Sequence, residues 1–184
     1  MIGLVGCVKS KHRTARPAGA MYRSPLFHGA REYVERSCER WLILSAHHGV
    51  LEPNEVIEPY DTTLLTFTIA EKREWSQRVV AQLQTRVSLE GAAFEIHAGQ
   101  EYYENGLLGF LSAASAYVVI PTVDLPLGEK LQFYNTPRHQ NWLSISDTAR
   151  CPSRRCKKSM HGQYIGFWSM YLLHRRLVLL KWAR

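Results

Sequence analysis

The sequence predicts an α/β fold, a three-layer sandwich built around a mostly parallel central sheet of four or more strands. Four short apolar runs, at residues 1–8, 41–45, 94–98 and 117–121, have the length of buried strands. Segments with helical periodicity separate them, and this alternation is typical of parallel strands joined by right-handed crossovers. The chain has 184 residues, of which 46% are hydrophobic, so it is long enough to bury the core of one domain.

The first strand and the first helix enclose a long loop. Residues 1–8 give way to residues 9–22, which combine Gly, Pro and basic side chains without periodicity and so predict a loop. Ser24 then favours a helix N-cap, and Pro25 favours the first helical position. The apolar side of this helix continues to about residue 40.

The second strand, residues 41–45, leads into a turn at residues 46–49, whose final Gly49 suits a sharp change of direction. A Pro-containing stretch over residues 52–65 comes next. An amphipathic helix is then expected over residues 69–87 because apolar side chains recur there at helical spacing. These side chains are Trp75, Val79, Val80, Leu83 and Val87.

The remaining elements continue the alternation and complete a domain over residues 1–137. The third strand precedes a predicted helix over residues 100–114. The fourth strand precedes a short helix around residues 128–134. A basic C-terminal extension follows over residues 138–184.

This extension has an apolar run over residues 164–180 that is interrupted by His174, Arg175 and Arg176. A membrane span needs about 20 predominantly apolar residues with few charges. We therefore expect an amphipathic helix here and no membrane span.

The composition favours a polyanionic partner in a reducing compartment. The net charge of +7 predicts nucleic acid or a nucleotide as the partner. Four scattered cysteines do not form a disulfide framework, and residues 1–8 lack a secretory signal, which predicts the cytoplasm. Cys151 and Cys156 are spaced more widely than the cysteine pairs of structural zinc sites, so we expect no metal and no cofactor.

The carboxyl ends of parallel strands meet at one edge of a sheet, where such folds bind their ligands. This rule brings together residues 7–11, 45–49, 97–102 and 121–124, with the loop at 59–61 beside them. The candidate substrate-binding residues at this edge are Cys7, Lys9, Lys11, Tyr22, Ser24, Ser45, Gly49, Tyr60, Gly99 and Tyr102.

Several of these residues suit phosphate. Lys9, Lys11 and Ser24 combine positive charge with the free amides of a strand end and a helix start. Ser24 serves equally well as a plain helix cap. Cys7 is a nucleophile only if nearby lysines lower its pKa, and a cysteine at a strand end is more typical of a small core residue.

Three polar side chains are candidate catalytic groups. His47 and His48 follow a buried strand and titrate near neutral pH, so either could transfer a proton. Asp61 follows the rigid Pro59–Tyr60 pair and either activates a water molecule or caps the next turn. Tyr60 is a candidate to stack on a base.

The motifs occur in an order that resembles a bacterial and phage family of unknown function, which is grouped with YaaA-like proteins. The family pattern is Cys-Ser-Lys, Tyr-x-Ser-x-Leu-Phe, Leu-Ser-Ala-Lys-Tyr-Gly-Leu and Pro-Tyr-Asp. The resemblance covers residues 1–135 and includes the run at 128–134. Val8 replaces the usual Ser after Cys7, and His47 and His48 replace Lys-Tyr.

A looser likeness connects the chain to the core domain of archaeosine-synthase-type enzymes and to uracil-glycosylase-like folds. The residues that carry it are Cys7, Lys11, Tyr22, Ser24 and His28. This resemblance implies chemistry on a nucleobase or nucleoside.

The leading hypothesis is an N-glycosidase that removes a modified nucleobase from DNA or a nucleotide. Asp61 would orient water or stabilise the sugar cation, and His47 or His48 would protonate the leaving base. One alternative is a non-enzymatic nucleic-acid-binding protein of stress response or phage–host conflict that works through the basic extension. The other is a nucleobase-modifying transferase with Cys7 or a lysine as the nucleophile.

Overall fold

The computed structural model describes residues 1–136, and the chain forms an α/β fold with a five-stranded, mostly parallel sheet. The expected extension over residues 138–184, with its amphipathic helix, Cys151 and Cys156, lies outside the described residues. No helix among residues 1–136 is long and apolar enough to cross a membrane.

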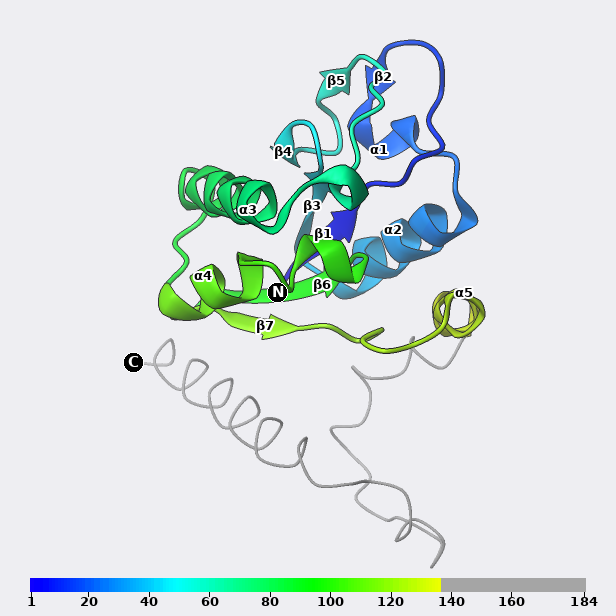
Figure 1. The fold of residues 1–184 in the computed structure, drawn as a ribbon. Coiled ribbons are helices and arrows are strands. Elements are labelled where there is room, and N and C mark those ends of the chain that lie inside the picture. Colours follow the sequence, from blue (N-terminus) through cyan, green and yellow to red (C-terminus); the bar gives the residue numbers. More distant parts are fainter. Residues whose placement is uncertain (137–184) are drawn as a thin grey trace, which may run out of the picture. The chain divides into compact units, whose positions relative to one another are not determined.

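The sheet has the strand order β4-β3-β1-β6-β7 (Figure 1). Strand β1 pairs in parallel with β3 and β6, β6 pairs in parallel with β7, and β4 is an antiparallel edge strand. The sequence prediction of a mostly parallel sheet is therefore confirmed. The strands are β1 (Ile2–Gly6), β3 (Arg40–Ser45), β4 (Gly49–Leu51), β6 (Ala93–His97) and β7 (Tyr117–Val119).

The chain reverses its direction of winding at β1, in the middle of the sheet. It first winds from β1 to β3 and later returns to add β6 on the other side of β1, followed by β7. The carboxyl ends of β1 and β6 therefore flank a topological switch point, where open α/β sheets place their ligands.

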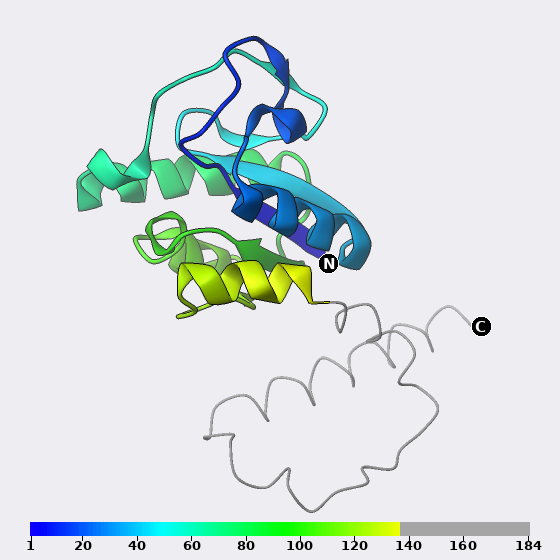
Figure 2. The ribbon, with the colours of Figure 1, turned by 90° about the vertical axis from the view of Figure 1, so that its right-hand side faces the viewer.

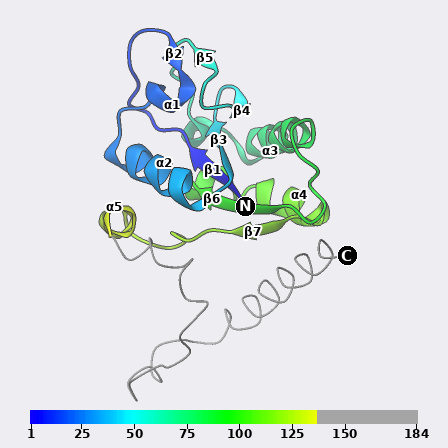
Figure 3. The same ribbon diagram turned by 180° about the vertical axis from the view of Figure 1, so that it is seen from behind.

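Two pairs of helices accompany the sheet. Helix α2 packs on β1 and β3 and contacts α5, whereas α3 packs on β4 and contacts α4. The views from two opposite sides place the α2–α5 pair on one side of the sheet and the α3–α4 pair on the other (Figures 1 and 3). The helices are α2 (Pro25–Ser37), α3 (Ile69–Gln84), α4 (Leu107–Ala113) and α5 (Leu127–Asn135).

Local signals in the sequence explain where the two long helices start. Ser24 caps α2 by accepting a hydrogen bond from the Leu26 amide at 3.2 Å, with Pro25 in the first turn. Thr68 and Glu71 form a capping box at the start of α3. Four residues of the predicted apolar side of α3 are buried, Trp75, Val79, Val80 and Leu83. The helix ends at Gln84, so the predicted end at residue 87 is wrong, and Val87 follows the helix and is partly buried.

The prediction of one helix over residues 100–114 is wrong. The chain forms a short 3-10 helix at Gln100–Tyr102, then a turn, and then α4. Gly106 lies between them with φ of +141°, a conformation outside the helical region that side-chain-bearing residues rarely adopt. This glycine separates the two segments, although the apolar spacing continues across it.

The loop predicted over residues 9–22 holds two short elements, β2 (Arg16–Pro17) and α1 (Ala18–Met21). Strand β2 pairs with β5 (Val56–Ile57), so a small second sheet lies above the end of the main one (Figure 2). It brings the loop after β1 next to the stretch that leads to Tyr60.

Candidate functional site

The ends of β1 and β6 approach each other very closely at the switch point. A side chain at Gly6 would place its Cβ 2.7 Å from the Cβ of Ala98, which is closer than real contacts allow. Glycine is therefore required where the first strand leaves the sheet.

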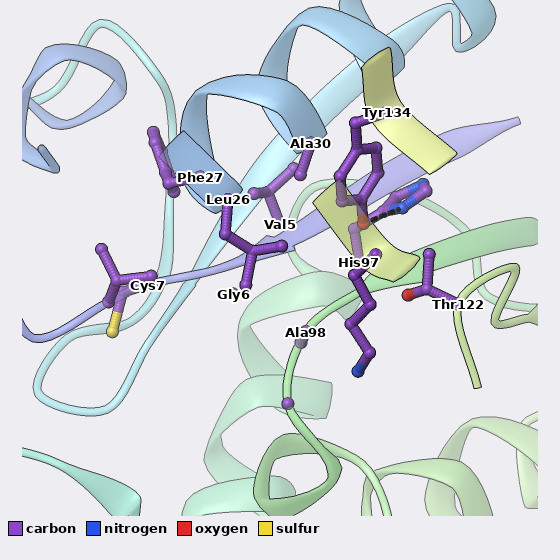
Figure 4. A pocket seen from close by; sticks show the side chains of 13 residues that line it. Val5, Gly6, Cys7, Leu26, Phe27, Ala30, His97, Ala98, Thr122 and Tyr134 are labelled. Atoms are coloured by element: carbon purple, nitrogen blue, oxygen red, sulfur yellow. Dashed lines mark hydrogen bonds between the residues drawn. The ribbon is translucent and has the colours of Figure 1, made fainter. Parts of the chain in front are cut away.

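A pocket lies beside this close contact, between the ends of β1 and β6 and helices α2 and α5 (Figure 4). One wall is apolar and comes from Leu26, Phe27 and Ala30 of α2. Figure 4 shows Cys7 at one end of the pocket, with His97 and Tyr134 at the other. The cavity volume is about 80 Å³. This is smaller than the roughly 300–1,000 Å³ of pockets that enclose drug-sized ligands, so the pocket has room for only a small group.

Buried polar side chains form a chain behind the pocket, from β6 to α5. The His97 Nδ1 atom lies 2.9 Å from the Tyr134 hydroxyl, and its Nε2 atom lies 3.2 Å from Glu95 Oε1. The second pair is within ion-pair range but is not aligned as a hydrogen bond. Burial raises the pKa of Tyr134 to about 12. This chain fastens α5 to the sheet.

Cys38 touches the same chain, with its Sγ atom 3.8 Å from Glu95 Oε2. Burial, and then the Glu95 carboxylate, raise the pKa of this thiol to about 11. Cys38 therefore stays a protonated thiol near neutral pH.

A second group of polar side chains lies between the ends of β1 and β3 and the Tyr60 segment. Ser45 donates to the Tyr60 hydroxyl at 2.8 Å, which lies 2.8 Å from the Tyr22 hydroxyl. Burial is the main cause that raises the pKa of both phenols. We call Tyr22, Ser45 and Tyr60 the hydroxyl cluster. Its members hold each other in place and remain uncharged.

Lys11 lies over the hydroxyl cluster. Its Nζ atom is 4.2 Å from the centre of the Tyr60 ring and 5.9 Å from that of Tyr22. Burial lowers the pKa of Lys11 from 10.5, while the nearby Cys7 and Asp61 partly oppose this shift.

Cys7 lies where the pocket and the hydroxyl cluster meet. The side chain is 8% exposed and lines the pocket, and its sulfur is 3.0 Å from the Tyr102 hydroxyl. The Tyr102 hydroxyl also donates to the Cys7 carbonyl oxygen at 3.2 Å. Burial, followed by Cys7, raises the pKa of Tyr102. The predicted residues Cys7 and Tyr102 are thus in direct contact.

The His47–His48 turn has one accessible ring. His47 is exposed, stacks on Tyr60 at 5.2 Å, and places Nδ1 3.1 Å from the Thr62 hydroxyl. His48 is partly buried, its Nε2 atom has no hydrogen-bond partner in the described structure, and burial lowers its pKa. Of the two histidines, His47 is the one available to a ligand.

The turn itself depends on Gly49 and Gln82. Gly49 has φ of +81°, and a Cβ there would lie 2.1 Å from Gln82 Oε1. That oxygen accepts from the Val50 amide at 2.7 Å, while Gln82 Nε2 donates to the His48 carbonyl at 3.0 Å. Gly49 therefore has a structural role in shaping the turn.

The other predicted residues lie around this edge. Asp61 and Lys9 are exposed. Asp61 is close enough to Lys11 for its charge to raise the pKa of that lysine. Ser24 uses its hydroxyl to cap α2. Gly99 is exposed and lines the pocket.

Three residues in or beside the pocket were not among the predicted site residues, namely Lys130 and Tyr134 in its lining and Glu95 next to His97. Thr122, which also lines the pocket, falls within residues 121–124, which were expected at this edge. Glu95 and His97 alternate with apolar residues along β6. Polar residues at every second position of a buried strand are the signal that could have drawn attention to Glu95. Among residues 1–136, no group of three His, Cys, Asp or Glu side chains is arranged to hold a metal ion.

The fold and the site define an α/β protein with a pocket at a topological switch point and a lysine-bearing hydroxyl cluster beside it. The chain belongs to the Family of unknown function (DUF6884), whose model matches residues 2–136. No curated protein matches the chain.

Proposed function

We propose that the protein is an N-glycosidase that removes a modified nucleobase from DNA or from a nucleotide. The observation that supports this most is the position of Cys7 between a pocket and a pair of charged side chains. A small pocket with an apolar wall lies on one side, and Lys11 with Asp61 lies on the other. The base enters the pocket, and its sugar lies over the edge of the sheet.

The chemistry requires one bond to break and one to form. The C1′–N bond breaks, and its electron pair and a proton go to the nitrogen of the leaving base. Water adds its oxygen to C1′ and gives its proton to Asp61, whose carboxylate also stabilises the cationic sugar. His47 is accessible and supplies the proton to the base, whereas His48 maintains the turn.

Binding uses the basic groups of the same edge. Lys9 and Lys11 hold phosphate together with the amides at the start of α2, which Ser24 caps. The Tyr60 ring already contacts Lys11 and His47, so its role in the site is to position these two side chains. On duplex DNA, the target nucleotide leaves the stack before it enters the pocket.

The fold type, the partner and the compartment of the protein belong to the same proposal. The two helix pairs support a three-layer sandwich. The resemblance to YaaA-like proteins, and the looser one to archaeosine-synthase-type and uracil-glycosylase-like proteins, belong to the same proposal, and the looser one supports chemistry on a nucleobase. The partner is nucleic acid or a nucleotide, in keeping with the net charge of +7, and the compartment is the cytoplasm.

Asp61→Asn tests the proposal. On oligonucleotides that carry a panel of modified bases, this variant should release base about 100-fold more slowly or worse, because amide nitrogen cannot take the proton of water. Mass spectrometry of the released base measures the rate. DNA affinity should persist, since Asp61 contributes no positive charge.

Glu58→Gln is the matched control because Glu58 is an exposed carboxylate of the same loop. It should keep the wild-type rate of base release. Full activity in Asp61→Asn would remove Asp61 from the mechanism, and no released base from any substrate of the panel would contradict the glycosidase proposal.

The position of Cys7 supports a second candidate function, modification of a nucleobase through a covalent adduct. The thiol adds across a C=N bond of the base, its sulfur to carbon and its proton to nitrogen. Intact-mass measurement should then show a gain equal to the mass of the base. Cys7→Ser should lose the gain and Cys38→Ser should keep it. A glycosidase with no covalent base would leave the mass unchanged. The non-enzymatic alternative rests on residues 138–184, outside the described residues.

A further inference from the structure

We infer that Lys11 is a nucleophile that forms a Schiff base with the C1′ aldehyde of an abasic site in DNA and thereby cleaves the strand. This activity rests on the proposed function, because an abasic site is the product that an N-glycosidase leaves in DNA. It assigns to Lys11 a covalent role beyond phosphate binding.

The backbone around Lys11 is fixed by hydrogen bonds to the segment before α2. The Arg23 amide donates to the Ser10 carbonyl at 3.0 Å, and the His12 amide donates to the Met21 carbonyl at 2.9 Å. Lys11 itself forms an antiparallel bridge with Tyr22. The amine is therefore held at a defined place over the hydroxyl cluster, as a nucleophile must be.

The surroundings of the amine favour its neutral form more than water does. Burial is the largest cause of its lowered pKa, whereas the cation–π contacts with the Tyr22 and Tyr60 rings attract the charged form. Two acidic groups, Cys7 and Asp61, face it and act in the opposite direction. A partly desolvated lysine with a lowered pKa is the form that reacts with carbonyl carbon near neutral pH.

The other lysines of the described part of the chain have different settings. Lys9 is exposed, and Lys72 forms an ion pair with Glu101. Lys130 belongs to α5 and lines the opposite side of the pocket. Lys11 alone among these four lies over the aromatic rings beside Asp61.

The reaction balances without a further reactant. The neutral amine of Lys11 adds to the C1′ aldehyde, and loss of water gives a protonated imine. Asp61 takes the proton from C2′, and the electron pair of that C–H bond moves to expel the 3′ phosphate. Water then returns to C1′ and releases Lys11, so the net change is an elimination that cuts the strand.

Reductive trapping tests this directly. A labelled duplex oligonucleotide with one preformed abasic site is incubated with the full chain and sodium cyanoborohydride. A covalent protein–DNA complex should form, and peptide mapping should place the DNA on Lys11. Lys11→Arg and Lys11→Met should each lose at least nine-tenths of it, while Lys72→Arg should keep it. Thermal unfolding of each variant verifies that it is folded.

The pH dependence gives a second readout. The trapping rate should fall as the pH drops through the lowered pKa of Lys11, because the protonated amine does not attack. Asp61→Asn removes a group that raises this pKa, so it should shift the trapping profile to lower pH. An ordinary structural lysine would produce no such shift.

Three results would overturn the inference: no complex with the wild-type chain, a complex of equal yield in folded Lys11→Arg, or DNA attached to another amine such as that of Met1. Because the abasic site is supplied ready-made, none of these results depends on base release. Failure of base release with successful trapping would instead contradict the proposed glycosidase and leave the Lys11 chemistry standing.

Discussion

Replacing His97 with leucine is expected to lower the free energy of unfolding by about 3–5 kcal/mol, because it leaves the Glu95 carboxylate buried without its imidazole partner. Glu95 and His97 are 5% and 4% exposed, so water does not compensate for the loss. The Tyr134 hydroxyl also loses the Nδ1 atom that it contacts at 2.9 Å. Urea denaturation followed by circular dichroism measures the effect.

A double variant separates the charge from the packing. Adding Glu95→Gln to His97→Leu replaces the carboxylate that has lost its imidazole partner with a neutral amide, and this should restore about 1–3 kcal/mol. Glu90→Gln, which changes an exposed carboxylate just before β6, should leave stability unchanged within about 0.5 kcal/mol. If the double variant were no more stable than His97→Leu, the Glu95–His97 pair would contribute to the free energy of unfolding through packing and not through charge.

Gly49→Ala should lower the free energy of unfolding by about 2–4 kcal/mol. About 1 kcal/mol comes from a side chain at φ of +81°. The larger part comes from displacing Gln82, which leaves the buried Val50 amide without its acceptor. Differential scanning calorimetry of the variant measures this loss.

The Gln82→Ala variant provides the comparison for Gly49→Ala. In that background the new methyl group no longer meets an amide oxygen, so the further cost of Gly49→Ala should fall to that of the backbone conformation, about 1 kcal/mol. An equally large cost in both backgrounds would show that the overlap with Gln82 is relieved by movement of the turn.

The fold was predicted well where a clear apolar pattern or a capping residue lies within the element itself. The four parallel strands, and helices α2 and α3, are identified by apolar runs and by capping residues such as Ser24. Strand β4 was not predicted because three residues after a turn carry no period. The break at Gly106 was missed because apolar spacing continues through it, and only the backbone angle reveals the turn.

The candidate site was predicted in part, for a similar reason. Residues that directly follow strands, such as Cys7 and Ser45, can be placed together from topology alone. Tyr22 and Tyr60 come together through the small β2–β5 sheet, which the sequence did not predict. Tyr134 reaches the pocket from α5, and its contact with His97 depends on how α5 packs, which no local pattern specifies.

Helix α5 determines how far a fragment of the chain must extend to keep the pocket closed. A Cβ on Gly29 of α2 would lie 2.9 Å from the Cβ of Tyr134, so the two helices meet in close contact. Lys130 and Tyr134 of α5 complete the pocket wall. A fragment that stops before residue 127 would retain every strand of the main sheet, yet it would present an open hollow with His97 uncovered. The smallest unit able to enclose a ligand therefore extends through Tyr134, two residues short of where the family match ends at residue 136.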